Sequence, residues 1–164
     1  MFKKYIQNIP DFPTEGINFK DMSPLIANHW PTVIGQLATY IWTKQYDIDY
    51  FVGIESRGFL LASGLATKLN KGIIMCRKPG KLPPPYIKQQ YTTEYSEDEL
   101  QIKPGKGKVI IVDDVLATGG TLKATNKLCK KSGYEVVDNI VLINLQYIPR
   151  EKFNYNIKSF IQYE

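Results

Sequence analysis

Two adjacent carboxylates, followed by a short threonine- and glycine-rich segment, are the side chains of this sequence best suited to chemistry. Asp113 and Asp114 come directly after the apolar residues 109–112, and residues 118–121 read Thr-Gly-Gly-Thr. Glycines let backbone N–H groups approach an anion closely, threonine hydroxyls donate hydrogen bonds, and a helix that begins there adds positive potential. The carboxylates can accept hydrogen bonds from sugar hydroxyls or hold a hydrated metal ion. The pattern therefore predicts a site for a phosphate beside a vicinal diol, the outline of ribose 5-phosphate.

A structural alternative exists for the same residues, because paired acids after a strand also occur as helix caps and solvated turns. A lone Asp-Asp or Gly-Gly would favour that alternative. The complete order of apolar run, acid pair, small residues and Thr-Gly-Gly-Thr before a helical pattern favours the anion site. The apolar run itself predicts a strand buried on both faces of a parallel sheet, and the helix is expected to end near Lys131.

Other elements must position these residues. Strand and helix patterns alternate before and after the acid pair, which predicts βαβ units and a parallel α/β sheet. We expect helices over about 30–46 and 60–69, and strands over 50–54, 72–76, 136–145 and 157–163, with a bulge at Asp138 and Asn139. Residues 16–21 are expected to be extended, 22–24 to form a turn, and 86–96 to form part of a β-ribbon in a long hinged excursion typical of an active-site lid.

Composition bounds the class of protein. The chain has 164 residues, 43% hydrophobic and 23% charged, as expected for one soluble domain. Its net charge of +5 fits a polyphosphate substrate, and the lack of any block of five Lys or Arg residues argues against a nucleic-acid-binding arm. The first residues lack a signal-peptide pattern, and no apolar stretch is long enough for a membrane span. We expect reduced core thiols at Cys76 and Cys129, hence a cytoplasmic protein, although sequence leaves a disulfide between them open.

Three more sets of residues are candidates. Arg57, in the turn Glu55-Ser56-Arg57 after the predicted strand 50–54, can present a forked cation to diphosphate or can form a structural pair with a glutamate. The cations of residues 77–81 are compatible with a polyphosphate clamp or with a solvated loop. Phe19 can fill the core or stack on a flat base, and its chemistry alone favours the core.

Five segments, in this order, resemble the adenine phosphoribosyltransferases, a branch of the type I phosphoribosyltransferase family: IPDFPTEGINFKDMSPL, GIESRGF, RKPGKLP, TTEYS and VIIVDDVLATGGT. The resemblance extends over nearly the whole chain, and five segments in register are far more specific than any single one. It implies a Rossmann-like, twisted, mainly parallel sheet flanked by helices within one domain, residues 1–164. It also implies a small N-terminal hood (about 1–28) and a mobile loop (about 78–98).

The implied activity is transfer of the 5-phosphoribosyl group from phosphoribosyl diphosphate to adenine, giving AMP and diphosphate in purine salvage. The resemblance further implies Mg²⁺ and a homodimer, with no nucleic acid or membrane partner. The metal is expected to be held by the diphosphate and the ribose hydroxyls, with waters bridging to Asp113 and Asp114, rather than by direct protein ligands.

The resemblance also assigns roles by position. Phe19 is expected to stack on adenine while the backbone near Lys20 reads the edge of the base, and Val115 to cover the other face. The diphosphate is assigned to Glu55, Ser56, Arg57 and Lys81, with Lys78 or Arg77 acting across a dimer. The ribose hydroxyls are assigned to Asp113 and Asp114, and the 5-phosphate to Ala117, Thr118, Gly119, Gly120 and Thr121. The expected catalytic residues are Glu94, which relays a proton at the purine, Tyr95, which helps to close the lid, and Arg57.

Two other functions remain open at this level. The same fold could act on hypoxanthine, guanine or xanthine, although the Phe19 segment and the Glu94-Tyr95 lid argue against that. A regulator could bind phosphoribosyl diphosphate without catalysis, but it would need an added DNA-binding segment for which 164 residues leave no room.

The proton relay assigned to Glu94 makes a prediction. We expect Glu94→Ala to lower turnover by about 10²–10⁴-fold, the usual contribution of general acid–base catalysis, with a much smaller effect on substrate affinity. Steady-state kinetics with adenine varied would measure both quantities. An unchanged turnover number would remove Glu94 from the mechanism.

Overall fold

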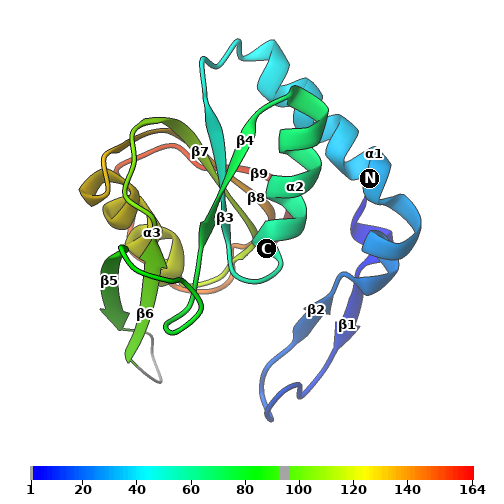
Figure 1. The fold of residues 1–164 in the computed structure, drawn as a ribbon. Coiled ribbons are helices and arrows are strands. Elements are labelled where there is room, and N and C mark those ends of the chain that lie inside the picture. Colours follow the sequence, from blue (N-terminus) through cyan, green and yellow to red (C-terminus); the bar gives the residue numbers. More distant parts are fainter. Residues whose placement is uncertain (1, 93–96) are drawn as a thin grey trace.

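The computed structural model describes residues 2–92 and 97–164, and a five-stranded, fully parallel sheet forms its centre (Figure 1). Its strands are β3 (Tyr50–Ile54), β4 (Gly72–Cys76), β7 (Gly107–Leu116), β8 (Tyr134–Leu145) and β9 (Lys158–Tyr163). Their spatial order is β4-β3-β7-β8-β9, so β7 is the middle strand. Its residues Val109–Val112 are fully buried, as a strand covered on both faces requires. The predicted parallel α/β fold is confirmed.

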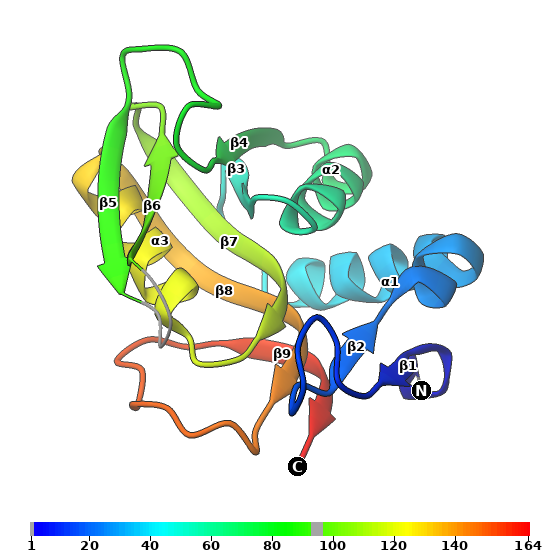
Figure 2. The same cartoon turned by 90° about the horizontal axis from the view of Figure 1, so that it is seen from below.

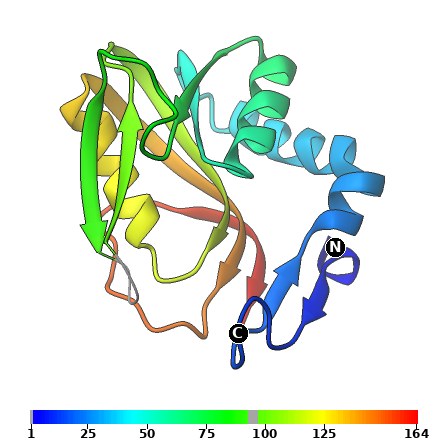
Figure 3. The ribbon, with the colours of Figure 1, turned by 60° about the horizontal axis from the view of Figure 1, so that its bottom comes forward.

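Helices cover both faces of this sheet (Figure 3). Helices α1 (Ser23–Thr43) and α2 (Gly58–Leu69) pack on one face, where their buried side chains join those of Phe51, Ile110 and Val112. Helix α3 (Gly120–Lys131) packs on the other face together with a hairpin, and contributes Leu128 and Cys129 to a second core. No helix within the described residues has the length and apolar character needed to cross a membrane.

Helix α1 begins and ends earlier than predicted. The turn expected at residues 22–24 is wrong, because the helix already begins at Ser23 with Pro24 in its first turn. Proline is tolerated there, since the first N–H groups of a helix have no partner within it. Pro31 lies inside the helix on its exposed side, so it does not mark a boundary, and the helix ends at Thr43 rather than near residue 46.

The N-terminal residues form a small unit beside the sheet (Figure 2). It consists of the 3₁₀ helix η1 (Phe2–Tyr5) and strands β1 (Gln7–Ile9) and β2 (Phe19–Asp21), which pair antiparallel. Phe2 and Ile6 are buried in the same core as α1, which anchors the unit to the rest of the fold. We call residues 2–21 the hood.

The β-ribbon expected at residues 86–96 is present as a hairpin that extends further along the chain. Strand β5 (Ile87–Thr92) pairs antiparallel with β6 (Glu97–Ile102), so the second strand lies later in the chain than predicted. Leu100 and Ile102 of β6 are fully buried and belong to the core on the α3 side of the sheet. The hairpin is therefore packed onto the core along β6, and residues 93–96, between its strands, lie outside the described residues.

The bulge predicted at Asp138 and Asn139 falls one residue earlier. Val109 pairs with Val136 and Ile110 with Asp138, so Val137 is the additional residue in β8. Asp138 and Asn139 are both buried and both hydrogen-bonded. The Tyr46 hydroxyl donates to Asp138 (2.6 Å), and the Asn126 amide donates to Asn139 (2.7 Å).

Candidate active site

The acidic pair lies within a strand rather than after it. Strand β7 continues through Asp113 and Asp114 to Leu116, which corrects the expectation that it ends at residue 112. Pairing with β8 extends to Leu116 opposite Asn144, and this longer ladder holds both acids on a rigid backbone. The two side chains alternate in direction along the strand. Both carboxylates nevertheless line the same cavity, described below.

A turn from the neighbouring strand β3 packs against these acids. Residues 55–57 connect β3 to α2, and Gly58 lies directly against the end of β7. A Cβ built on Gly58 would be 2.9 Å from the carbonyl oxygen of Val112 and 3.2 Å from Oδ1 of Asp113. Glycine at position 58 is thus required for the close approach that places this turn beside the acidic pair.

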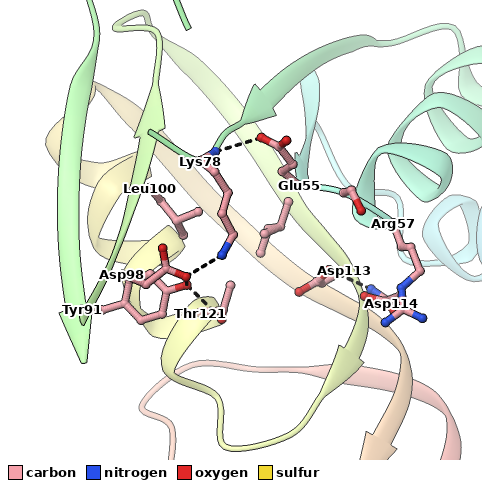
Figure 4. A pocket seen from close by; sticks show the side chains of 11 residues that line it. Glu55, Arg57, Lys78, Tyr91, Asp98, Leu100, Asp113, Asp114 and Thr121 are labelled. Carbon is pink, nitrogen blue, oxygen red and sulfur yellow. Dashed lines mark hydrogen bonds and ion pairs between the residues drawn. The ribbon is translucent and has the colours of Figure 1, made fainter. Parts of the chain in front are cut away.

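Together these elements enclose a polar cavity of about 350 Å³, which we call the acid cavity (Figure 4). It is lined by Ile54, Glu55, Ser56, Arg57, Lys78, Tyr91, Asp98, Leu100, Asp113, Asp114 and Thr121. Its wall carries both carboxylates and cations, so the cavity can hold a group that carries both negative charge and hydroxyls.

Arg57 pairs with an aspartate, whereas the structural alternative considered for it was a pair with a glutamate. Its Nε lies 2.8 Å from Oδ2 of Asp114, and its guanidinium lies 5.5 Å from the centre of the Phe19 ring. Glu55 instead accepts hydrogen bonds from the backbone N–H of Lys78 (2.9 Å) and from Arg77 (3.3 Å). The bond from the Lys78 backbone is the main reason that the pKa of Glu55 is lowered.

The two aspartates are electrostatically coupled. Burial, together with the adjacent Asp114 carboxylate, raises the pKa of Asp113 well above its usual range, and this outweighs the opposing effects of the Asp114 N–H bond and Arg57. The Asp114 N–H donates to Oδ1 of Asp113 at 2.9 Å. A ligand that donates hydrogen bonds or brings a cation here would favour the ionised form of Asp113.

The hairpin forms one wall of the acid cavity through residues that the sequence analysis did not select. The Lys78 ammonium lies 2.5 Å from the Asp98 carboxylate, which also accepts a bond from the Tyr91 hydroxyl at 3.1 Å. The Thr121 hydroxyl lies 3.5 Å from that of Tyr91. Asp98 and Tyr91 are paired across β5 and β6. The alternation of polar residues along the hairpin could have predicted that they share one face, but not that this face lines the cavity.

A second cavity, of about 470 Å³, separates the hood from the end of the sheet, and we call it the hood cavity. It is lined by Gly16, Ile17, Asn18, Phe19, Lys20, Arg57, Val115, Ala117, Thr118, Leu145, Tyr147, Ile148 and Pro149. Phe19 is half-buried on its wall, and so the structure places this ring at a cavity rather than in the core. The Lys20 side chain is buried, donates to Asn8 (2.7 Å) and lies over the Tyr163 ring.

A third cavity of about 70 Å³, the loop cavity, lies at the start of α3. Its wall includes Asp113, Val115, Ala117, Thr118, Gly119 and Thr121. Gly119 has a φ of +86°, a conformation that glycine adopts without strain, and it immediately precedes the helix. Gly120 is the first residue of α3, and none of the three cavities is lined by it.

The three cavities share walls. Arg57 lines both the acid and hood cavities, Asp113 and Thr121 line both the acid and loop cavities, and Ala117 and Thr118 line both the hood and loop cavities. They therefore surround the end of β7 as one continuous site with a polar, a mixed and a small compartment. Of the predicted residues that the structure describes, Gly120 and Lys81 line none of the three cavities.

Lys81 is exposed and lines none of the three cavities, and its carbonyl oxygen accepts a bond from Arg77. The roles predicted for Glu94 and Tyr95 cannot be compared with the geometry, because these residues lie outside the described ranges 2–92 and 97–164.

A family profile described as phosphoribosyl transferase domain matches residues 28–160. The chain therefore belongs to the phosphoribosyl transferase family. It is 43% identical to the adenine phosphoribosyltransferase of Hydrogenovibrio crunogenus, over 98% of this chain and 95% of that relative. It is 46% identical to that of Bdellovibrio bacteriovorus, over 98% of each. Within the family the chain belongs to the adenine phosphoribosyltransferases, which transfer a 5-phosphoribosyl group from phosphoribosyl diphosphate to adenine in purine salvage.

Solved structures agree with this placement. The crystal structure of adenine phosphoribosyltransferase from Thermoanaerobacter pseudethanolicus matches with a TM-score of 0.91 and 37% identity, covering 99% of this chain and 98% of that one. The enzyme from Saccharomyces cerevisiae, solved with adenine and an imino-altritol bisphosphate, matches with a TM-score of 0.83 and 32% identity, covering 92% and 94%.

The raised pKa of Asp113 predicts a stabilising substitution. This carboxyl ionises more readily in the unfolded chain than in the folded one, so its ionisation lowers the free energy of unfolding as pH rises above about 4. Asparagine cannot ionise and still accepts the Asp114 N–H. We expect Asp113→Asn to melt at a higher temperature than the wild type at pH 7–8, with the difference shrinking toward pH 4.

Calorimetric melting curves across this pH range would measure the effect. Asp47→Asn is the matched control, because Asp47 is exposed and its pKa is lowered by its hydrogen bond with Lys108, so no gain is expected there. A difference between Asp113→Asn and wild type that does not change with pH would contradict this account.

Proposed function

We propose that the three cavities divide the substrates of the adenine phosphoribosyltransferase reaction among them. The acid cavity takes the diphosphate and the ribose hydroxyls, the hood cavity takes adenine, and the loop cavity takes the 5-phosphate. The observation that carries this proposal is their shared walls around the end of β7. The reacting atoms of base, ribose and diphosphate must meet at one carbon, and only adjoining compartments allow that.

The base site rests on Phe19 and Val115, which line the hood cavity together. An aromatic ring on one wall and an aliphatic side chain on another suit the two faces of a flat purine. The backbone around Lys20 is proposed to read the edge of the base, since the Lys20 side chain is already bonded to Asn8. The yeast relative solved with adenine supports a purine as the ligand.

The sugar and its phosphates are assigned to the polar walls. Asp113 and Asp114 are proposed to accept the ribose hydroxyls, and residues 117–121 to surround the 5-phosphate with backbone N–H groups and threonine hydroxyls at the N-terminus of α3. Glu55, Ser56 and Arg57 are proposed to form the diphosphate site. Lys78 already faces the acid cavity, whereas Lys81 would have to move to reach it.

The reaction is a substitution at C1 of the ribose with inversion. A nitrogen of adenine bonds to C1 as the C1–O bond to diphosphate breaks, and the diphosphate leaves with the electron pair. Arg57 lines both the acid and the hood cavities, so it lies where this bond would break. A cation there stabilises the charge that develops on the leaving group more than it stabilises the bound substrate.

The proton lost by adenine and the exclusion of water are assigned to the loop that includes residues 78–98. Glu94 is proposed to relay the proton, and Tyr95 to help close the loop. An oxocarbenium-like carbon is easily trapped by water, so the reaction needs a cover over the site. The contacts of Asp98 with Lys78 and Tyr91, and of Tyr91 with Thr121, support the hairpin as that cover.

Magnesium fits this site as a substrate-held ion. No group of three or more His, Cys, Asp or Glu side chains that could hold a metal is found among the described residues. The acid cavity nevertheless offers two adjacent carboxylates, Asp113 and Asp114, which would hold the ion through waters while the diphosphate and ribose supply its direct ligands. Bound Mg²⁺ would neutralise charge on the departing diphosphate.

Product formation with separate purines tests the proposed function. We expect AMP and diphosphate from adenine, phosphoribosyl diphosphate and Mg²⁺, and no nucleotide from hypoxanthine, guanine or xanthine. Chromatography of the nucleotides would measure this. Product from guanine instead would assign the hood cavity to another purine, and binding of phosphoribosyl diphosphate without any product would indicate a regulator.

We also propose that residues 1–164 act as one cytoplasmic domain that forms a homodimer. The two described cysteines are buried and free, as expected in a reducing compartment. Strand β4 lies at the edge of the sheet, and its Ile73 and Met75 are exposed, as is Leu60 of α2. An unpaired edge with apolar side chains is a natural surface for self-association.

Sedimentation velocity would test this association. We expect the wild type at twice the chain mass of 18.8 kDa and Met75→Asp at the mass of one chain, because a charge on this surface would be desolvated in the dimer. Trp42→Gln is the control, since Trp42 is also exposed but lies on α1. A monomeric wild type would contradict the proposal.

A further inference from the structure

The segment that joins β8 to β9, residues 146–157, passes beside the loop between β7 and α3 (Figure 2). We call it the strap. Arg150 extends from the strap to the end of β7, where one of its nitrogens donates to the carbonyl oxygens of Ala117 (2.8 Å), Leu116 (3.3 Å) and Leu145 (3.3 Å). The other terminal nitrogen donates to the Asn144 side chain at 2.5 Å. One guanidinium thus joins β8 to the first residues of the loop.

These bonds fix the direction of the loop amides. A trans peptide is planar, so its carbonyl and the following N–H point in opposite directions. Because the Ala117 carbonyl points toward Arg150, the N–H of Thr118 points away from Arg150. In the same way, the bond to the Leu116 carbonyl directs the N–H of Ala117 away from Arg150. The positive guanidinium also polarises both peptides, which makes their N–H groups better donors to an anion.

A second contact supports the loop from the same segment. The Phe153 ring lies so close to Gly119 that a Cβ built there would be 2.4 Å from its Cζ atom. The strap therefore contacts the loop on both sides of Thr118, through Arg150 and through Phe153. Neither residue lines the acid, hood or loop cavity, so any effect on a ligand must act through the loop backbone.

We propose that Arg150 is a positioning residue that aims the amide N–H groups of Ala117 and Thr118 at the 5-phosphate. This inference rests on the proposed function, in which residues 117–121 surround that phosphate. Burial lowers the pKa of Arg150, yet it remains a cation at neutral pH because arginine starts from a very high value. The same role could not be filled by lysine, whose single ammonium lacks the planar fork that reaches several acceptors at once.

Comparing the binding of AMP with that of adenosine isolates the contribution of the 5-phosphate to affinity. We expect Arg150→Gln to weaken AMP binding by about tenfold, as for the loss of one or two hydrogen bonds to a charged group, and to change adenosine binding less than twofold. The KM for phosphoribosyl diphosphate should rise by a similar factor while the KM for adenine changes little. Arg150→Lys should recover only part of the AMP affinity. Isothermal titration calorimetry would give the two dissociation constants.

Lys152→Gln is the matched control, because it removes a cation two residues further along the strap and should leave the ratio of AMP to adenosine affinity unchanged. Should Arg150→Gln fail to fold, Phe153→Leu tests the same loop and is expected to show the same selective loss for AMP. Equal losses for AMP and adenosine, or no loss for either, would overturn the role of Arg150. A wild type that binds AMP no more tightly than adenosine would instead refute the 5-phosphate site itself.

Discussion

Asp113 and Asp114 extend from the middle strand of the sheet, directly after four fully buried residues. The loss of hydration of two adjacent carboxylates at the edge of an apolar core must be compensated by other polar groups. Arg57 meets Asp114, and Asp113 keeps a raised pKa because burial and its neighbour both disfavour its charge. Burial and the neighbouring carboxylate thus make the ionised form of Asp113 less stable here than in water. In the proposed function, the ribose hydroxyls and a hydrated cation would stabilise these carboxylates, which accounts for placing the chemistry at the end of this strand.

The surrounding elements divide the end of β7 into compartments of different polarity. The turn after β3 can approach closely because position 58 has no side chain, and it adds Glu55 and Arg57 to the polar compartment. The hood contributes Phe19 from a strand that is anchored through Phe2 and Ile6, and so an aromatic ring is held over the less polar compartment. The order of the cavities around one strand end follows from the parallel sheet, in which the carboxyl ends of adjacent strands share one edge.

The strap and the hairpin support this site from outside it. Asp98 joins Lys78 to Tyr91 across the hairpin, while Arg150 and Phe153 hold the loop that precedes α3. Their contacts are with backbone or with other protein side chains, and they stabilise the geometry of groups that line the three cavities. A site for a flexible, highly charged substrate needs such support, because misdirected amides or cations lose most of their effect.

Much of this arrangement could be predicted from local patterns. Periodicity predicts the buried residues Val109–Val112 and the alternation of strands with helices, and so the α/β fold follows from local patterns. The acid pair and the Thr-Gly-Gly-Thr segment are what the prediction of an anion site rests on. The start of α1 was missed because Pro24 and Pro31 resemble breakers, although a first-turn position and an exposed helix face tolerate them. The extra residue in β8 was misplaced by one position because register depends on the partner strand.

By itself, therefore, the sequence determined which segments are buried, that a buried strand, an acid pair and a helix follow one another, and the family to which the chain belongs. The tertiary structure alone decided that Arg57 pairs with Asp114 rather than Glu55, that Phe19 faces a cavity, and that Asp98 and Arg150 support the site. These are contacts between residues far apart in the chain or on different elements. Their geometry depends on strand order and packing, which local composition and spacing do not encode.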